Sequence, residues 1–190
     1  MNKKIKIFGF GGSLRKESYS FMLLKNAAKL VPDDVEIRLF EPSKLEAIPN
    51  FNQDKETSPE PALIEFKNEI KAADALLIST PEYNYSVPGY LKNAIDCASR
   101  PYTDNAFLNK PVALMSVSSG MLGGVKAQFS LRQSFVFLQM PAVNKPEILI
   151  SNAGEKFDSK GDLKDEKTKQ LITELLKNLS NLTRKLKTDS

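Results

Sequence analysis

The sequence contains no histidine and only one cysteine, and both shortages exclude classes of function. Histidine is the commonest general base and the commonest metal ligand in enzymes. A Ser-His-Asp or Cys-His hydrolase is therefore excluded, and a zinc site is not expected. A single cysteine, Cys97, cannot form a disulfide within the chain, which is typical of a reducing cytoplasm. If the protein is an enzyme, we expect a bound cofactor to supply the difficult chemistry.

The sequence also has little that would direct the protein to a membrane or to nucleic acid. No apolar run is long enough to span a bilayer, and the first four residues lead directly into an apolar segment without a secretory signal. The net charge of +4 is mild, and the lysines are interleaved with acidic residues. We therefore expect a cytoplasmic protein that binds an anionic small molecule, with no membrane and no nucleic-acid partner.

Short apolar runs alternate along the chain with stretches of helical periodicity, and the length suits one domain over residues 1–190. Strands are expected over residues 5–10, 35–40, 75–80, 111–117 and 142–150. Helices are expected over residues 21–30, 61–73, 89–100 and 125–138 and from 163 onward, with irregular connections over 41–61 and 151–162. This alternation predicts an α/β fold, a three-layer sandwich with a five-stranded parallel sheet. The flavodoxin-like strand order 2-1-3-4-5 is favoured over the first half of a dinucleotide-binding fold.

The loop between the first strand and the first helix is rich in glycine and hydroxyl groups. Its notable residues are Gly9, Gly11, Gly12, Ser13, Arg15, Ser18 and Ser20. A helix that follows such a loop directs unpaired N–H groups and the positive end of its dipole toward it. Together with the serine hydroxyls and one guanidinium, this arrangement predicts a phosphate site. The alternative is a simple connection in which Ser18 or Ser20 caps the helix.

Two well-known phosphate loops do not match this segment. The dinucleotide pattern G-x-G-x-x-G requires a glycine where Leu14 stands, which also disfavours the dinucleotide-binding fold. The nucleoside-triphosphatase pattern G-x-x-x-x-G-K-[ST] has no match in the chain. We therefore expect a monophosphate rather than a magnesium-bound triphosphate.

Three unusual loops follow the expected first, third and fourth strands, over residues 9–20, 81–88 and 118–124. In the order 2-1-3-4-5 these strands are neighbours. Ligands of open parallel sheets bind beyond the carboxyl ends of the strands, where the strand order reverses. We therefore expect the three loops to form one site.

The second and third loops carry groups suited to a flat ring. Tyr83 and Tyr85 offer flat apolar faces, and Asn84 offers an amide that can bind a ring edge. The glycines of residues 118–124 leave backbone N–H groups accessible. A phosphate site at one end and a planar heterocycle at the other match flavin mononucleotide, FMN.

Each of these features also has a purely structural interpretation. Residues 81–84 can form a plain type I turn, and residues 118–124 can serve only to start the next helix. Glu82 can be a solvated loop acid, and Cys97 can be a core residue of its helix. The coincidence of three such loops at one edge is what favours a site.

The same residues resemble a known family. The first matching segment is Gly12-Ser13-Leu14-Arg15-Lys16-Glu17-Ser18. The second begins with Pro81-Glu82-Tyr83-Asn84-Tyr85-Ser86-Val87-Pro88 and continues to Asp96 in the following helix. The third comprises residues 118–124, followed by Ala127-Gln128 and Leu131-Arg132. Over about residues 4–150 the chain resembles the NADPH-dependent FMN reductase family, whose members include quinone, azo-dye and chromate reductases. The chain departs from the family at Ser20, Cys97 and Lys126, where Asn, Trp and Arg are common.

The resemblance implies a flavodoxin-like fold, bound FMN, and a homodimer or homotetramer with the flavin near the subunit interface. It implies that the phosphate is held by Ser13, Arg15, Ser18 and Ser20. It further implies that the isoalloxazine is lined by Pro81, Glu82, Tyr83 and Asn84, and that its pyrimidine edge meets Ser118 and Gly120.

Together these observations predict an FMN-dependent oxidoreductase with NADPH or NADH as co-substrate. The electron acceptor is expected to be a small molecule: a quinone, an azo compound, free flavin or a metal oxyanion. The flavin carries the chemistry, so no catalytic side chain is expected. The alternatives are a non-enzymatic flavodoxin-type electron carrier and a flavin-free binding module on the same fold. The net basic charge disfavours the carrier, since such carriers are usually acidic.

Overall fold

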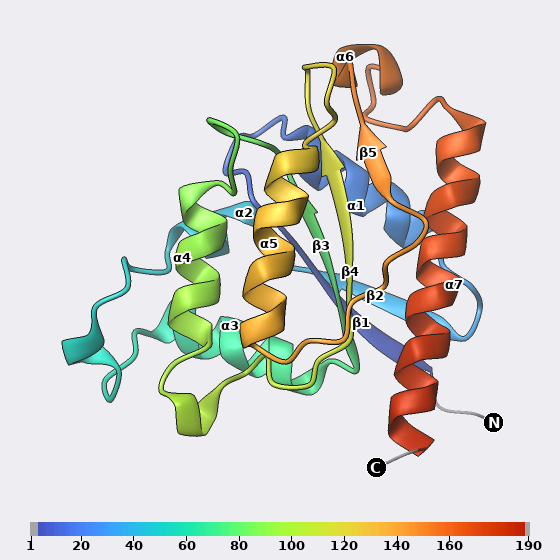
Figure 1. Cartoon of the computed structure of the whole chain (residues 1–190). Helices are drawn as coiled ribbons and strands as arrows, with labels where there is room; N and C mark the ends of the chain where they lie inside the picture. Colours follow the sequence, from blue (N-terminus) through green and yellow to red (C-terminus); the bar gives the residue numbers. More distant parts are fainter. Residues whose placement is uncertain (1–3, 189–190) are drawn as a thin grey trace.

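A five-stranded parallel sheet runs through the middle of the molecule in the order β2-β1-β3-β4-β5 (Figure 1). The structure is a computed structural model that describes residues 4–188. Its strands are β1 (Ile5–Gly11), β2 (Val35–Leu39), β3 (Ala75–Thr80), β4 (Val112–Val117) and β5 (Ile148–Ile150). Its longer helices are α1 (Tyr19–Lys29), α3 (Pro61–Ala72), α4 (Gly89–Ala98), α5 (Val125–Phe137) and α7 (Glu166–Thr188). The predicted α/β fold and strand order are confirmed.

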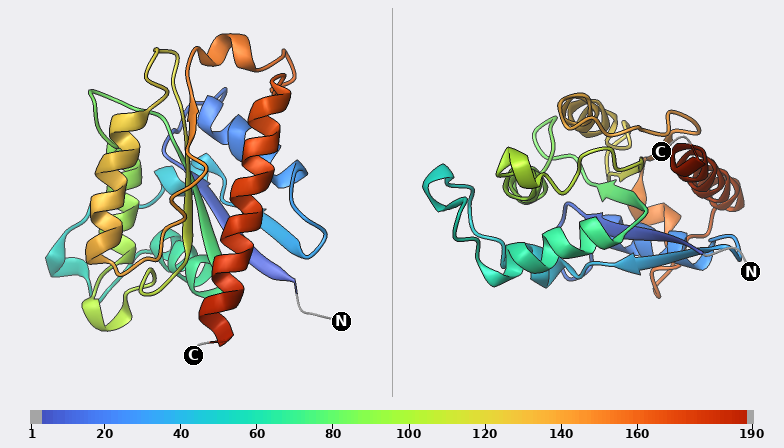
Figure 2. Two further views of the ribbon diagram at one scale, coloured as in Figure 1. Left: turned by 45° about the vertical axis from the view of Figure 1, so that its right-hand side comes forward. Right: turned by 90° about the horizontal axis from the view of Figure 1, so that it is seen from below.

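Helices cover both faces of the sheet, which gives three layers (Figure 2). On one face, α3, α4 and α5 pack on a cluster that includes Phe8, Phe10 and Phe66. On the other face, α1 and α7 pack on a cluster that includes Ile5 and Ile7. Every residue of β3 and β4 is buried. This explains why both strands read as continuous apolar runs in the sequence.

The segment predicted as an irregular connection over residues 41–61 contains two short helices, so this prediction was wrong in part. Helix α2 spans Pro42–Glu46, and a 3-10 helix spans Gln53–Lys55. Proline is favourable at the first helical position because its missing N–H would have no partner there. The segment is too short and too polar for helical periodicity to reveal these turns.

The fifth strand is shorter than the predicted 142–150. Only Ile148–Ile150 pairs with β4 as a strand, while Ala142 forms an isolated bridge to Val112. Pro146 lies between the two contacts, and proline cannot donate a hydrogen bond to a sheet. The position of β5 at the edge of the sheet is as expected.

The segment after β5 was predicted to be irregular over residues 151–162, which is wrong in part, and the segment is held against α1. A short helix, α6, spans Ala153–Lys156, and Phe157 pairs with Leu163 in an isolated bridge. The buried amide of Asn26 donates to the carbonyl of Gly161 at 2.8 Å and accepts from the N–H of Leu163 at 2.9 Å. Helix α7 then starts at Glu166, three residues later than expected.

The carboxyl ends of the strands carry the three loops, and the amino ends lie near both ends of the described chain. Loops 12–18, 81–88 and 118–124 all lie at the carboxyl ends of their strands. The described chain begins and ends at the opposite edge, because β1 starts there and α7 runs back toward it (Figure 1). Within residues 4–188, no helix combines the length and the apolar composition that crossing a membrane requires.

Candidate functional site

The three loops surround a hollow of about 190 Å³ at the carboxyl edge of the sheet. Its lining residues are Ser13, Arg15, Ser18, Tyr19, Ser20, Pro81, Glu82, Tyr83, Val117, Ser118 and Ser119. The structure thus brings together eight of the ten residues predicted from the sequence. The other two, Asn84 and Gly120, lie next to lining residues in the chain and are not part of the lining themselves.

The first loop gathers three buried serine hydroxyls at the start of α1. Ser13, Ser18 and Ser20 are at most 4% exposed, and the hydroxyls of Ser18 and Ser20 are 2.9 Å apart. Ser18 is the N-cap of α1, since its hydroxyl accepts from the N–H of Phe21 at 3.3 Å. The capping interpretation of Ser18 is therefore confirmed. The hydroxyl of Ser13 accepts a long hydrogen bond, 3.4 Å, from the N–H of Arg15.

The guanidinium of Arg15 is exposed beside these hydroxyls, and no ion pair engages it within residues 4–188. The other donors of the loop are the first-turn N–H groups of α1, which precede the first intrahelical hydrogen bond. Hydroxyls, helix-start N–H groups and a free guanidinium are the donors that phosphate binds in proteins. The donor set therefore fits the phosphate of FMN.

Glycine at position 12 allows a close approach between the first and second loops. A Cβ atom there would lie 3.2 Å from Pro88 and 3.1 Å from Leu91. The N–H of Gly12 also donates to the carbonyl of Ser79 at 3.0 Å, which ties the loop to β3. The first loop can therefore lie directly against the second.

The second loop is a tight turn centred on Asn84 and Tyr85. Tyr83 and Ser86 exchange backbone hydrogen bonds of 3.1 and 3.0 Å. Asn84 and Tyr85, the two central residues of this turn over residues 83–86, have φ values of 50° and 64°, whereas both central residues of a type I turn have negative φ. Positive φ is rare for a tyrosine, and such strain concentrates at functional sites. The hydroxyl of Tyr83 lies 3.5 Å from that of Ser13, so this turn reaches back to the first loop.

Glu82 is not the solvated loop acid of the structural alternative. Its carboxylate Oε2 accepts from the N–H of Lys126 at 2.9 Å and from the N–H of Ala127 at 3.2 Å. Both donors belong to the first turn of α5. The side chain therefore connects the second loop to the helix that follows the third.

The third loop is anchored on both sides by hydrogen bonds. Ser118 donates its N–H to the carbonyl of Ile150 at 2.9 Å, and Gly120 donates its N–H to the hydroxyl of Ser118 at 3.0 Å. On the other side, the buried amide of Gln128 donates to the hydroxyl of Ser116 at 3.0 Å. That hydroxyl in turn donates to the carbonyl of Gly123 at 2.5 Å.

Several residues of the site were missed by the sequence interpretation. Tyr19 lines the hollow and stacks on Phe157, with ring centroids 5.6 Å apart. Gln128 supports the third loop from α5, where it lies beside the apolar residues that face the core. Two signals could have indicated a buried polar contact for Gln128: its place among core-facing positions and its place in a segment that resembles the family.

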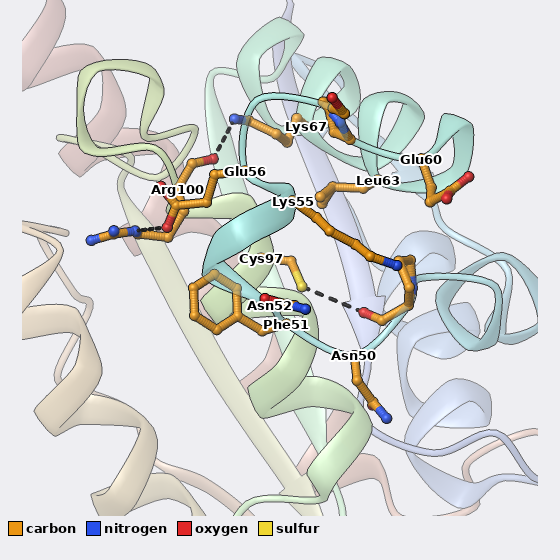
Figure 3. A pocket seen from close by; sticks show the side chains of 13 residues that line it. Asn50, Phe51, Asn52, Lys55, Glu56, Glu60, Leu63, Lys67, Cys97 and Arg100 are labelled. Carbon is orange, nitrogen blue, oxygen red and sulfur yellow. Dashed lines mark hydrogen bonds and ion pairs between the residues drawn. The ribbon is translucent and has the colours of Figure 1, made fainter.

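A second hollow lies between α4 and the segment that follows α2 (Figure 3). Its volume is about 50 Å³, enough for a few water molecules and far too small for a flavin. Arg100 and Glu56 form an ion pair of 2.6 Å at one end, and Lys67 donates to the carbonyl of Arg100 at 2.8 Å (Figure 3). Cys97 points its Sγ toward the carbonyl of Pro49 at 3.5 Å. The core interpretation of Cys97 is confirmed, since this residue is 5% exposed.

Comparisons with known proteins identify the family of the chain. A family model described as NADPH-dependent FMN reductase matches residues 5–155. An NAD(P)H-dependent FMN reductase of Pseudomonas aeruginosa is 44% identical over 188 residues, which cover 98% of this chain and 100% of the relative. A quinone reductase of Pseudomonas putida is 45% identical over 156 residues, 82% of each chain.

The solved structures agree as well. The flavoenzyme NAD(P)H:(acceptor) oxidoreductase of Paracoccus denitrificans superposes with a TM-score of 0.85 at 31% identity. The match covers 95% of this chain and 98% of the other.

Proposed function

The chain belongs to the NADPH-dependent FMN reductase family, and from this premise we propose that it is an FMN-dependent NAD(P)H oxidoreductase that reduces quinones. The observation that carries the proposal is the cluster of buried serine hydroxyls and one free guanidinium at the start of α1. These donors fit a terminal phosphate, and the two neighbouring loops lie beside them.

The residues of the hollow have distinct roles in this proposal. Ser13, Arg15, Ser18 and Ser20 hold the FMN phosphate. The second loop, over residues 81–84, lines the isoalloxazine, and Ser118 and Gly120 meet its pyrimidine edge. When bound there, FMN would supply the hydride and electron transfer between nicotinamide and acceptor. The protein binds and orients both partners, and the lack of histidine is compatible with this role, since protons can come from water.

Quinones are the favoured acceptor because several relatives are named for quinone reduction. These include the Pseudomonas putida relative and an NAD(P)H:quinone oxidoreductase of Solanum tuberosum, 42% identical over 96% of this chain. Azo compounds, free flavin and metal oxyanions are the alternative acceptors. The single free thiol supports a cytoplasmic location.

The absorbance spectrum of the purified protein, followed by titration with flavins, tests the cofactor. We expect a yellow protein, or an apoprotein that binds FMN more tightly than FAD and far more tightly than riboflavin, which lacks the phosphate. Equal affinity for FMN and riboflavin would contradict the phosphate site.

Turnover without any partner protein tests the activity. We expect NAD(P)H oxidation to depend on an added quinone, with azo dyes and chromate compared in the same assay. Tight FMN binding without NAD(P)H oxidation would instead support a flavodoxin-type electron carrier. Failure to bind any flavin would support a binding module that retains only the fold.

We further propose that the protein is a homodimer or homotetramer that associates through the outer face of α5. Phe129, Val136 and Phe137 are 59%, 81% and 69% exposed on this helix. Tyr102 packs beside Phe137, with ring centroids 6.1 Å apart, and is itself 62% exposed. A groove of about 680 Å³ adjoins these rings between α4 and α5. Large exposed apolar patches of this kind mark interaction sites.

Light scattering tests the association. We expect a mass of two or four chains for the unmodified protein and a smaller assembly for Val136→Glu, because a carboxylate would be buried unpaired. Glu174→Ala on α7, a helix on the other face of the sheet, is the control. A monomer at working concentration would contradict the proposal.

A further inference from the structure

Helix α5 starts at a residue whose own side chain cannot cap it. The residue at the N-cap is Gly124, which has a φ of 83° and offers no side chain. A Cβ atom there would lie 2.8 Å from the Cβ of Ser116, and the backbone conformation itself disfavours other residues. The usual capping residues Ser, Thr, Asp and Asn are therefore excluded from this position. The first turn of α5 also contains no acidic residue.

The missing cap comes from a residue that lies more than forty positions earlier in the chain. Glu82 follows β3 by two residues, and its Oε2 accepts from the N–H groups of Lys126 and Ala127 at 2.9 and 3.2 Å. These are the two first-turn donors that a capping side chain normally satisfies. The carboxylate also places a negative charge at the positive end of the helix dipole.

A second contact joins the same two elements. The ammonium group of Lys126 lies over the ring of Tyr85, with Nζ 3.1 Å from the ring centroid. Tyr85 belongs to the strained turn of the second loop, where its φ is 64°. The second loop and the start of α5 are therefore linked through both a carboxylate and a cation–π contact.

We propose that Glu82 is a positioning residue: it caps α5 from the second loop and so fixes the second and third loops relative to each other around the flavin. The inference rests on the proposed function for its ligand. In this role Glu82 acts on the hollow indirectly, by holding the start of α5 against the second loop. Its negative charge also offsets the positive end of the α5 dipole near the proposed flavin site. The capping hydrogen bonds and the negative charge of Glu82 can be tested separately, because the substitution Glu82→Gln keeps an acceptor oxygen and removes the charge.

The test compares Glu82→Ala with Glu82→Gln in the full chain. Hydrogen exchange of the apoprotein measures the cap directly, at the N–H groups of Lys126 and Ala127. In Glu82→Ala we expect exchange at both positions to accelerate by about tenfold and FMN affinity to fall by about tenfold, the size of one charge-assisted hydrogen bond. Glu36→Ala, which removes an exposed carboxylate on β2, is the matched control and should change neither quantity.

Glu82→Gln separates positioning from charge. We expect it to keep exchange rates and FMN affinity within about threefold of the unmodified protein, because the acceptor is retained. The midpoint potential of the bound flavin should nevertheless become more positive, because a negative charge near the electron-accepting ring has been removed. A residue with a purely structural role would leave this potential unchanged.

Three results would overturn the inference. Unchanged exchange at Lys126 and Ala127 in Glu82→Ala would mean that the cap does not form in solution. Faster exchange with unchanged FMN affinity would mean that the cap does not position the loops. An unchanged potential in Glu82→Gln would remove the electrostatic role. If the unmodified protein binds no FMN, the proposed function fails instead, and the exchange rates alone decide whether Glu82 caps α5.

Discussion

Arg15 is the exposed member of a cluster whose other side chains are buried. The three serine hydroxyls beside it already have contacts with one another or with backbone groups, whereas its guanidinium is free of ion pairs within residues 4–188. A free cation beside buried hydroxyls is what an incoming phosphate would neutralise. Under the proposed function, Arg15 is therefore the residue that distinguishes a phosphate site from an ordinary capped helix.

We expect Arg15→Ala to weaken FMN binding by about 1.5–3 kcal/mol, the range for a hydrogen bond to a charged group. Arg15→Lys should restore only part of this, because a point charge does not reproduce the forked donor of arginine. Titration of apoprotein with FMN measures both. Arg38→Ala is the control, since Arg38 pairs with Glu69 at 2.7 Å on the β2 side of the sheet. Unchanged affinity in Arg15→Ala would place the phosphate elsewhere.

Cys97 illustrates how burial controls a single side chain. Burial, with a smaller contribution from the negative charge of Asp96, raises the pKa of its thiol from 9.0 to about 11. The folded protein therefore keeps the thiol proton between pH 9 and 11, where the unfolded chain loses it. The resulting stabilisation is fully present below pH 9 and is lost as the pH rises toward 11.

We accordingly expect the free energy of unfolding to fall more steeply between pH 9 and 11 in the unmodified protein than in Cys97→Ala. Urea unfolding at a series of pH values measures the difference. The native thiol should also react with an alkylating reagent far more slowly at pH 8 than in the unfolded chain, because the thiolate is the reactive form. Equal slopes for the two proteins would show that the thiol titrates normally.

At the scale of elements, the third loop depends on glycines in the left-handed region. Gly123 and Gly124 have φ values of 60° and 83°, and a Cβ atom at either would lie within 3 Å of a neighbouring atom. The hydroxyl of Ser116 donates to the carbonyl of Gly123, so the loop and β4 form one unit. This unit sets where α5 begins.

Gly124→Ala should lower the free energy of unfolding by roughly 1–3 kcal/mol, because it adds both backbone strain and a steric overlap. Gly89→Ala is the matched control. It lies at the first position of α4 with no atom within 4 Å of an added Cβ, so we expect it to be neutral or slightly stabilising. Denaturant unfolding of both variants measures the effect. A neutral Gly124→Ala would mean that the loop relaxes without cost.

The central elements could be predicted from the sequence because their patterns are local. Strand β3 has the bounds predicted for it, since a strand buried on both faces is a continuous apolar run between polar turns. The short strand β5 could not be predicted in length, because the interruption near Pro146 depends on contacts with β4. Eight predicted site residues line the hollow because the loops follow adjacent strands, which the strand order determines.

What the sequence could not predict is the partner of a polar side chain across the fold. The contact between Glu82 and the start of α5 joins positions 44 residues apart. The contact between Gln128 and Ser116 requires the relative placement of β4 and α5. Neither has a periodic or local pattern, so only the assembled structure identifies these residues.

At the scale of the whole molecule, the proposed function places the nicotinamide and the acceptor at the same hollow. We therefore expect the nicotinamide and the acceptor to visit the flavin in turn, which gives parallel lines in double-reciprocal plots of rate against either substrate. NAD(P)H alone should bleach the flavin absorbance in anaerobic stopped flow. Because the chain has no histidine, the pH profile of that bleaching should lack a step near pH ~6.5. Intersecting lines would mean that both substrates bind together.

The described chain begins and ends at the edge of the sheet opposite the three loops (Figure 1). Helix α7 is fastened there through Arg184 to Asp34 at 2.6 Å and through Lys187 to Asp74 at 2.5 Å. A linker attached beyond either end would therefore leave the flavin edge facing outward. If the protein were attached to an electrode through such a linker, the hollow would stay open to quinones in solution. Attachment through a surface cysteine engineered near residue 85 would instead cover the hollow.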